Sequence, residues 1–183
     1  MRDLIVTENI TLDGVIEAAD WFNVANAEGV DQSDITEVLG AHMASSDAVL
    51  FGRVSFEEMR GYWPKQSDDT TGVTEHLNES TKYVVSSTLQ DPEWANTVIL
   101  RSLDEVRGVK DQPGNDIVAT GSIQLVRALA ATDLVDEYRL FVYPVVEGKG
   151  RRLFTAALRL PALRLVETRP FASGVVLLRY RSS

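Results

Sequence analysis

The sequence contains no cysteine. This absence excludes disulfide bonds, catalysis by a thiolate and metal sites built on cysteine. Histidine is also scarce, since His42 and His76 are the only two in the chain. Neither belongs to a cluster of residues with metal-ligand spacing. We therefore expect both to be helix or surface residues, and we expect no metal site.

Long apolar stretches and an excess of positive charge are missing as well. No run approaches the ~20 apolar residues of a membrane span, and the N-terminus lacks an apolar segment followed by a cleavage site, so we expect a cytoplasmic protein. The 18 basic side chains are outnumbered by 27 acidic ones, for a formal net charge of -9. This balance argues against a nucleic-acid surface, which needs a basic face. A single phosphorylated cofactor remains compatible, because a few local arginines suffice to bind it.

The remaining composition is that of an ordinary globular protein, with 183 residues, 44% hydrophobic and 25% charged. This length favours one domain over residues 1–183. Strand-like apolar runs alternate with segments of helical spacing, and two apolar runs, 163–171 and 175–180, flank a turn at the end. This order predicts an α/β, three-layer sandwich with a mixed, mostly parallel central sheet and a C-terminal antiparallel hairpin.

One stretch combines a strand, a glycine turn and a helix. Ile117-Val118-Ala119 has the length of a buried strand, Thr120-Gly121-Ser122 follows it, and helical spacing of apolar residues begins at Ile123. Such a turn places backbone N–H groups, a hydroxyl N-cap and the positive end of a helix dipole at one edge of a sheet, which favours a phosphate. An ordinary βα turn has the same composition, so this turn alone does not decide between them.

Two further turns have phosphate-compatible chemistry. Gly52-Arg53-Val54-Ser55 follows the apolar run 48–51, and an arginine at a helix start opposes the dipole unless an anion or a neighbouring acid is present. Ser86-Ser87-Thr88 follows the run 82–85, and its hydroxyls could bind phosphate or ribose, or cap a turn. Ligands of open α/β sheets collect at the carboxyl ends of the strands. A dinucleotide could therefore contact all three turns.

The N-terminal region offers candidates for a substrate pocket. Asn9 and Thr11 lie on one side of a predicted first strand, 4–10, and Asp13 follows in a glycine turn. The loop 17–32 carries Trp21, which either covers a ligand or packs on the surface. Asp34 either stabilises a helix start or faces the pocket. We expect the pocket between these segments.

The helix after this loop is expected to run from residue 33 to about residue 45. Ser33 and Glu37 have the spacing of a capping box. Its apolar positions predict a buried stripe, formed by Ile35, Val38, Leu39 and Met43.

Five motifs in this order resemble the dihydrofolate-reductase-like family, and within it the bacterial reductases related to the C-terminal domain of the riboflavin-biosynthesis deaminase–reductase. The motifs, which extend over nearly the whole chain, are TLDG at 11–14, VLFGRVSFE at 49–57, VVSST at 84–88, ATGS at 119–122 and PVVEGKG at 144–150 with Leu153-Phe154. Thr120 stands where the family's turn usually has the first of two glycines, and its Cβ could crowd a pyrophosphate.

The resemblance implies an NADPH-dependent reductase that transfers a hydride to a C=N or C=O group of a small, pterin- or pyrimidine-like substrate. Gly52, Arg53, Val54 and Ser55 would hold the adenosine-side phosphates, and Ser86, Ser87 and Thr88 the 2′-phosphate and ribose. Thr120, Gly121, Ser122, Ile123 and Gln124 would receive the pyrophosphate. The catalytic carboxylate would be Asp34, or failing that Asp13, with Asn9, Thr11 and Trp21 at the substrate.

The alternative is a non-catalytic member of the same fold that binds a nucleotide or acts as a dimeric scaffold. We expect a homodimer in either case. The runs 140–143 and 175–178 carry more apolar surface than an exposed edge should, and the resemblance implies pairing.

Overall fold

The protein is built on an eight-stranded sheet with the strand order β4-β3-β2-β5-β1-β6-β8-β7. The computed structural model describes residues 1–23, 30–155, 159–160 and 162–182. From β4 to β6 all neighbouring strands are parallel, whereas β8 is antiparallel to β6 and to β7, which confirms the predicted mixed sheet with its terminal hairpin. The strands are β1 (Leu4–Thr11), β2 (Ser46–Gly52), β3 (Thr81–Val85), β4 (Thr97–Leu100), β5 (Asp116–Thr120), β6 (Glu137–Tyr143), β7 (Arg164–Pro170) and β8 (Val176–Arg181).

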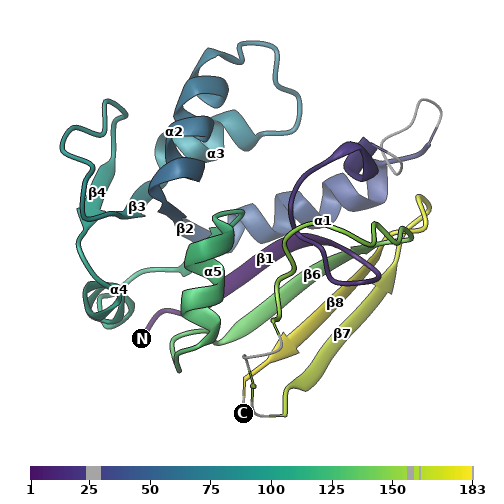
Figure 1. Cartoon of the computed structure of the whole chain (residues 1–183). Helices are drawn as coiled ribbons and strands as arrows, with labels where there is room; N and C mark the ends of the chain where they lie inside the picture. Colours follow the sequence, from purple (N-terminus) through teal and green to yellow (C-terminus); the bar gives the residue numbers. More distant parts are fainter. Residues whose placement is uncertain (24–29, 156–158, 161, 183) are drawn as a thin grey trace.

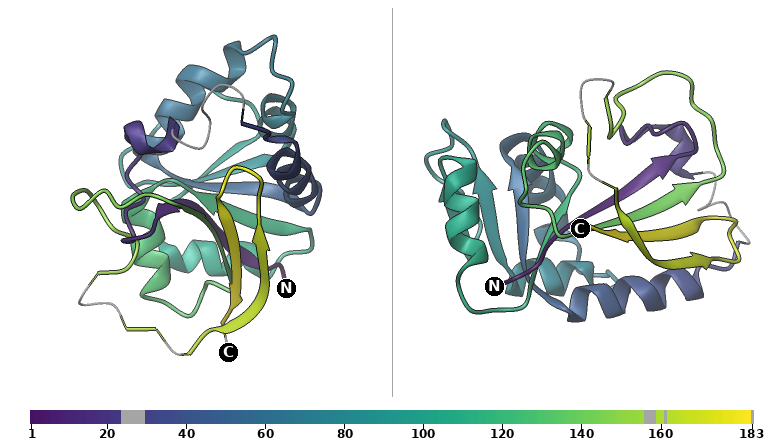
Figure 2. Two further views of the ribbon diagram at one scale, coloured as in Figure 1. Left: turned by 90° about the vertical axis from the view of Figure 1, so that its right-hand side faces the viewer. Right: turned by 90° about the horizontal axis from the view of Figure 1, so that it is seen from below.

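Helices cover both faces of the sheet. Helix α1 lies across one face and α5 across the other, so that the sheet forms a middle layer (Figures 1 and 2). The helices are α1 (Ser33–Ala44), α2 (Arg53–Tyr62), α3 (Val73–Glu79), α4 (Leu103–Lys110) and α5 (Ile123–Ala130), with short 3-10 turns η1 (Asp20–Asn23) and η2 (Trp63–Lys65). Across the residues that the structure describes, no helix has the length and apolar character needed to span a bilayer.

The two faces of the sheet are filled differently, because side chains alternate along each strand. On the α5 face, Leu4, Val6 and Leu50 join residues of α4 and α5 in one large core. On the α1 face the apolar residues form two separate clusters. One surrounds Phe141 and the other surrounds Phe51. The apolar packing of the α1 face is therefore divided, whereas that of the α5 face is continuous.

The start of α1 differs from the sequence-based prediction. Its N-cap is Gln32, whose side chain makes no capping hydrogen bond, so the expected capping box of Ser33 and Glu37 is wrong. Ser33 is the first residue of the helix rather than its cap, and its N–H donates to Oδ1 of Asp31 at 2.9 Å. Leu39 is 38% exposed, so it lies outside the buried stripe.

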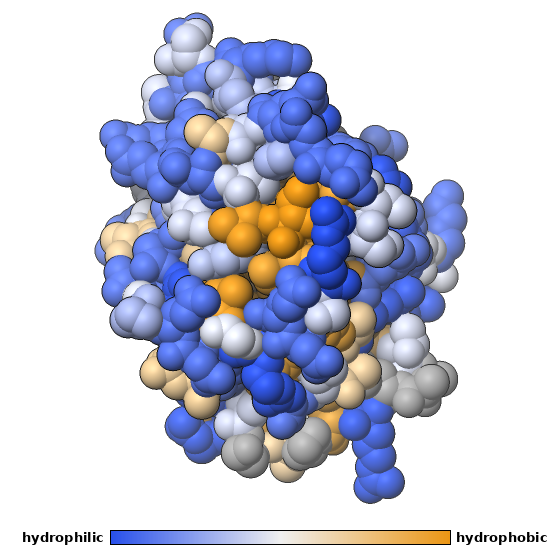
Figure 3. Space-filling view, turned by 90° about the vertical axis from the view of Figure 1, so that its left-hand side faces the viewer, coloured by the Kyte–Doolittle hydropathy of each residue, from blue (hydrophilic) through white to orange (hydrophobic). Residues whose placement is uncertain are grey.

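The apolar C-terminal strands are buried within the chain itself. Phe141 and Leu177 are 3% and 0% exposed, because β6 and β8 lie inside the sheet. The predicted reason for dimerisation, exposure of these strands, is therefore wrong. The exposed apolar residues of this end belong to the edge strand β7, where Leu165 is 51% exposed. The opposite edge, β4, lies on the side seen in Figure 3, whose central apolar area is surrounded by hydrophilic side chains.

Candidate functional site

The structure brings the three predicted turns together at one edge of the sheet. They follow β3, β2 and β5, which are immediate neighbours in the strand order. The register pairs Gly52 with Val85 and Leu50 with Ala119, so the three strands end at nearly the same level. A ligand lying along this edge would therefore contact all three turns.

Two hydrogen bonds join the turn after β2 to the turn after β5. The Gly52 N–H donates to Oγ of Ser122 at 2.9 Å, and the Ser122 N–H donates to Oγ of Ser55 at 2.9 Å. Gly121 and Ser122 have φ values of +59° and +49°, and these left-handed conformations turn Ser122 toward the neighbouring turn. Ser122 is the N-cap residue of α5, as the sequence predicts. Its hydroxyl, however, makes no capping hydrogen bond to the helix.

Helices α2 and α5 consequently begin side by side with open N-termini. In the described part of the chain, neither helix has a side chain that caps its first N–H groups. Such groups, with the positive end of the dipole, form an anion site when two helix starts meet. The donors here therefore fit the pyrophosphate of a dinucleotide.

Arg53 follows Gly52 at the start of α2. It pairs with a neighbouring acid, which was one of the two possibilities that the sequence left open. Its Nη1 donates to Oε2 of Glu57 at 2.8 Å, and the two side chains are 44% and 35% exposed. An exposed ion pair one helical turn apart contributes little free energy. The Arg53 guanidinium can therefore exchange this carboxylate for a phosphate at small cost.

The turn after β3 is held by an arginine from outside the turn that sequence reasoning missed. Ser86 caps this turn, since its Oγ accepts from the N–H groups of Thr88 and Leu89, whereas Ser87 and Thr88 are exposed. Arg101, which follows β4, donates from Nη1 to the carbonyl oxygens of Ser86 and Leu89 at 2.9 Å each. Its position directly after a strand-like run was the available signal, the same signal that singled out Arg53.

Glu8 is a second residue that sequence reasoning missed. It lies in β1 on the face opposite to Thr7 and is 4% exposed. Burial raises the pKa of its carboxyl well above the usual range, and a hydrogen bond from the Gly121 backbone only partly offsets this. A carboxyl group that keeps its proton to higher pH than an exposed glutamate therefore lies beside the turn after β5.

Thr11 and Asp13 hold the N-terminal turn together. The Thr11 hydroxyl donates to Oδ1 of Asp13 at 2.6 Å, and Asp13 also accepts from the N–H groups of Glu147 and Gly148. Its Oδ2 pairs with Arg152 at 3.2 Å. The Thr11 hydroxyl, followed by the two backbone N–H groups, holds the pKa of Asp13 far below its usual range, despite a smaller opposing effect of desolvation. Asp13 is thus ionised and bonded to the 147–152 loop, and in this arrangement it has no proton to donate.

Trp21 and Asp34 are likewise engaged in packing and hydrogen bonding. Trp21 is 3% exposed, its ring centroid lies 5.2 Å from that of Tyr143, and its Nε1 donates to the Glu17 carbonyl. These contacts favour the packing interpretation of Trp21. Asp34 accepts from the N–H groups of Ile35 and Ala172 at 2.8 Å each.

The pocket expected between the first strand, the 13–32 loop and α1 stays a prediction. Residues 24–29 of this loop lie outside the described residues. Asn9, which is exposed, Thr11, Asp13, Trp21 and Asp34 line neither of two well-formed cavities in the described part of the chain.

A cavity of about 220 Å³ lies beneath the C-terminal half of α1, beside the apolar cluster around Phe51. Thr7 and Thr120, which are partners in the strand register, line it from the sheet. The Thr120 side chain therefore faces this cavity. Leu39 and His42 line it from α1, and Arg139 lines it from β6.

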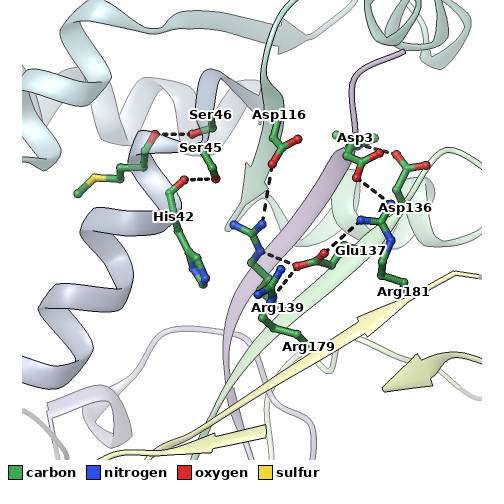
Figure 4. A network of polar contacts seen from close by, with 12 residues as sticks. Asp3, His42, Ser45, Ser46, Asp116, Asp136, Glu137, Arg139, Arg179 and Arg181 are labelled. Atoms are coloured by element: carbon green, nitrogen blue, oxygen red, sulfur yellow. Dashed lines mark hydrogen bonds and ion pairs between the residues drawn. The ribbon is translucent and has the colours of Figure 1, made fainter. Parts of the chain in front are cut away.

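Two residues that line this cavity each carry a fully buried polar atom. His42 Nδ1 and Arg139 Nη1 have no hydrogen-bond partner among the residues that the structure describes. Figure 4 shows the His42 ring reaching from α1 toward the Arg139 guanidinium. Burial, followed by the charges of Arg139 and Arg179, lowers the pKa of His42 to about 4, so the imidazole is neutral at pH 7.

Arg139 is oriented by a buried ion-pair network. Its Nε donates to Oε1 of Glu137 at 2.7 Å, and its Nη2 lies 3.9 Å from Oδ2 of Asp116. Arg179 donates to the same Glu137 oxygen at 2.8 Å (Figure 4). Burial raises the pKa of Glu137, but the hydrogen bonds from Arg179 and Arg139 outweigh it and hold the pKa below the usual range. Glu137 is therefore ionised, and its carboxylate holds the Arg139 guanidinium in place.

In the same described residues, no group of three or more acidic or histidine side chains is arranged to hold a metal ion.

The chain is similar in sequence to known proteins over nearly its whole length. Residues 2–177 match the family model described as the RibD C-terminal domain. The uncharacterized protein YyaP of Bacillus subtilis (strain 168) is 34% identical over 188 residues, covering 98% of this chain and 94% of that protein.

Two solved structures show the same fold. A riboflavin-biosynthesis-like protein from Shewanella sp. PV-4 superposes with a TM-score of 0.73 at 18% identity and covers 99% of both chains. Dihydrofolate reductase from Enterococcus faecalis, in complex with NADP(H) and RAB-propyl, gives a TM-score of 0.64 at 14% identity and covers 98% of this chain and 95% of that one.

Proposed function

The chain belongs to the RibD C-terminal domain family, and from this membership and the site geometry we propose that it is an NADPH-dependent reductase of a small molecule. The observation that carries the proposal is the meeting of three turns on the adjacent strands β3, β2 and β5. Their donors match the chemistry of a dinucleotide along its length. The substrate would carry the reducible C=N or C=O group.

The pyrophosphate would lie between the open starts of α2 and α5. Backbone N–H groups at helix starts bind phosphate without a side-chain charge. The two hydrogen bonds that join Ser122 to Gly52 and to Ser55 hold these starts in a fixed relation, so the donors are organised before the ligand arrives. Gly121, with φ of +59°, would let the backbone approach the phosphates closely.

The 2′-phosphate would lie beside Ser87 and Thr88, with Arg53 and Arg101 as its cations. A guanidinium has five N–H donors, so Arg101 can bind a phosphate while Nη1 keeps its two carbonyl partners. Both arginines lie at the edge where these hydroxyls are exposed. Two cations at this end favour NADPH over NADH, which lacks the phosphate.

The nicotinamide cofactor, when bound, supplies a hydride to the substrate carbon, and the substrate heteroatom takes up a proton. The protein has to hold the substrate against the cofactor and keep water out. Asp34 remains our proposed proton donor, and its role is testable.

Isothermal titration with NADPH and NADH tests the cofactor proposal. We expect the protein to bind NADPH more tightly, and Arg101→Ala to weaken NADPH by about tenfold while changing NADH little. Arg107→Ala is the matched control, because Arg107 is an exposed α4 arginine paired with Asp133. Equal affinity for both cofactors would contradict the 2′-phosphate site. Failure to bind either would favour the non-catalytic scaffold.

A further inference from the structure

We propose that Glu8 is a positioning residue of the cofactor site: its carboxyl supports the turn after β5, and it takes up a proton when a dinucleotide binds there. This inference rests on the proposed cofactor site. Glu8 acts through the backbone of the turn and through its charge, and it touches neither cofactor nor substrate. The proton comes from the solvent, and no bond of the cofactor changes.

The strand register places Glu8 beside the turn assigned to the pyrophosphate. Thr7 pairs with Thr120, so the next residues of the two strands are Glu8 and Gly121. Because side chains alternate along a strand, Glu8 points to the α5 face, as does Val6 in the core of that face. The carboxyl therefore lies under the segment that leads from β5 into α5.

The carboxyl supports this turn through its backbone. It accepts a hydrogen bond from the Gly121 N–H. The next residue, Ser122, has a φ of +49°, which costs energy for a residue other than glycine and so needs support from its surroundings. The bonds of Ser122 to Gly52 and Ser55 hold the turn from the α2 side. Glu8 holds it from the β1 side.

The surroundings of Glu8 favour its neutral form. The residue is 4% exposed, and within the described ranges its Oε1 is buried without a hydrogen-bond partner. Burial is the larger cause that acts on its pKa and raises it, the Gly121 bond lowers it, and no charged side chain is among the causes. An ionised Glu8 would thus be a buried charge without a counter-ion, which is costly.

The charged side chains of the elements around Glu8 are engaged elsewhere. Arg139 of β6 faces the opposite side of the sheet with its register partner Thr7. Arg127 is the charged residue of α5, and it donates to the Arg152 carbonyl. The other pairs are Arg53 with Glu57, Arg151 with Glu17, Arg152 with Asp13, and Arg139 with Glu137 and Asp116. None of these cations is directed at Glu8.

A bound pyrophosphate makes ionisation of Glu8 still less favourable. It would lie at the first N–H groups of α5, which begins at Ile123, two residues after Gly121. A nearby negative charge raises the pKa of a carboxyl. Between the pKa of Glu8 in the free protein and its higher pKa in the complex, only the complex holds the proton. Cofactor affinity therefore falls as the pH rises through this range.

Isothermal titration with NADPH at pH 7 and pH 9 measures this coupling. The 2′-phosphate is largely ionised at both values, since such phosphates have a second pKa of about 6. We expect the parent protein to bind NADPH about tenfold more weakly at pH 9 than at pH 7, as for a shift of about one pKa unit. Glu8→Gln keeps an acceptor for the Gly121 N–H but cannot ionise, so its affinity should change by less than about twofold.

Proton uptake itself can be measured at pH 8 by titrations in Tris and in HEPES, which differ in ionisation enthalpy. The parent should show net uptake, and Glu8→Gln should show none. Glu58→Gln is the matched control, because it removes an exposed acid of the neighbouring helix α2, and it should behave as the parent does.

Glu8→Ala tests the support of the turn. It removes the acceptor, so it should weaken NADPH about fivefold already at pH 7, where Glu8→Gln should match the parent. If Glu8→Ala does not fold, the parent and Glu8→Gln still decide.

Three results would overturn the proposal. They are equal affinity of the parent for NADPH at the two pH values, a pH dependence of Glu8→Gln as large as that of the parent, and unchanged affinity of Glu8→Ala at pH 7. Each of them leaves the cofactor site standing, because NADPH binds in all three. Absence of NADPH binding at either pH rejects both the cofactor site and the role of Glu8.

Discussion

At the scale of single residues, Glu8 links the protonation of one buried carboxyl to the stability of the fold. Because burial raises its pKa above the ordinary value of 4.5, the folded protein keeps a proton that the unfolded chain loses. Above about pH 4.5 the folded state therefore binds more protons than the unfolded state, and this group makes the protein less stable as pH rises.

Glu8→Gln should remove this pH dependence. We expect the variant to melt about 2–4 °C above the parent at pH 8, as for a gain of about 1 kcal/mol in a chain of this size, and to lose most of that advantage near pH 4.5. Melting curves between pH 4.5 and 8 measure the effect. Glu58→Gln, on the exposed side of α2, should show no such trend. A constant difference at all pH values would mean that Glu8 is ionised in the folded protein.

The sequence did not predict the roles of three charged residues, which are Arg101, Arg139 and Glu8. Each is a single charged residue next to or within a strand, and its role depends on the residues that distant parts of the chain bring beside it. Arg139 meets Asp116 from β5 and His42 from α1, and no local pattern records those contacts. The glycine turns were found because phosphate-binding chemistry is local: three or four consecutive residues make it.

At the scale of elements, Asp34 joins the start of α1 to the turn of the β7–β8 hairpin. Its carboxylate accepts from the Ala172 N–H, 138 residues away in sequence. Loss of such a bond costs about 1 kcal/mol. Asp34→Ala should therefore lower the melting temperature by about 2–4 °C.

The control is Glu37→Ala on the same helix, where the exposed side chain makes only a 3.6 Å ion pair with Arg169. Melting temperature and turnover together separate the two roles of Asp34. Earlier melting with full turnover makes it a structural residue. A drop in kcat/KM of about tenfold or more for Asp34→Asn, with unchanged melting, supports the proposed proton donor.

The elements themselves were largely predictable, and their packing was not. Apolar runs flanked by turns marked the strands, so the mixed sheet and its hairpin followed from local patterns. The cavity beneath α1 is lined by residues of α1, α2, α3 and four strands of the sheet. That arrangement depends on how α1 lies across the strands, and periodicity shows only that the helix has an apolar side.

At the scale of the whole molecule, we propose that two copies pair through the exposed edge of β7. Leu165 and Val166 are 51% and 41% exposed there, which is unusual for neighbouring apolar residues of an edge strand. Light scattering at micromolar concentration should give the mass of a dimer, and Leu165→Lys should give a monomer. Val98→Lys, on the opposite edge strand β4, should remain dimeric. A monomeric parent protein would reject the proposal.

The strand order has a consequence for how the chain is made. Strand β1 leaves the ribosome first, yet both of its neighbours, β5 and β6, begin at Asp116 and Glu137. At ~5–20 residues per second, its apolar side chains wait many seconds for their partners. During that time β2, β3 and β4 can pair with each other but leave an open position beside β2. We therefore expect a pause in translation before residue 116 to prolong the exposure of these apolar side chains and to promote aggregation of the nascent chain.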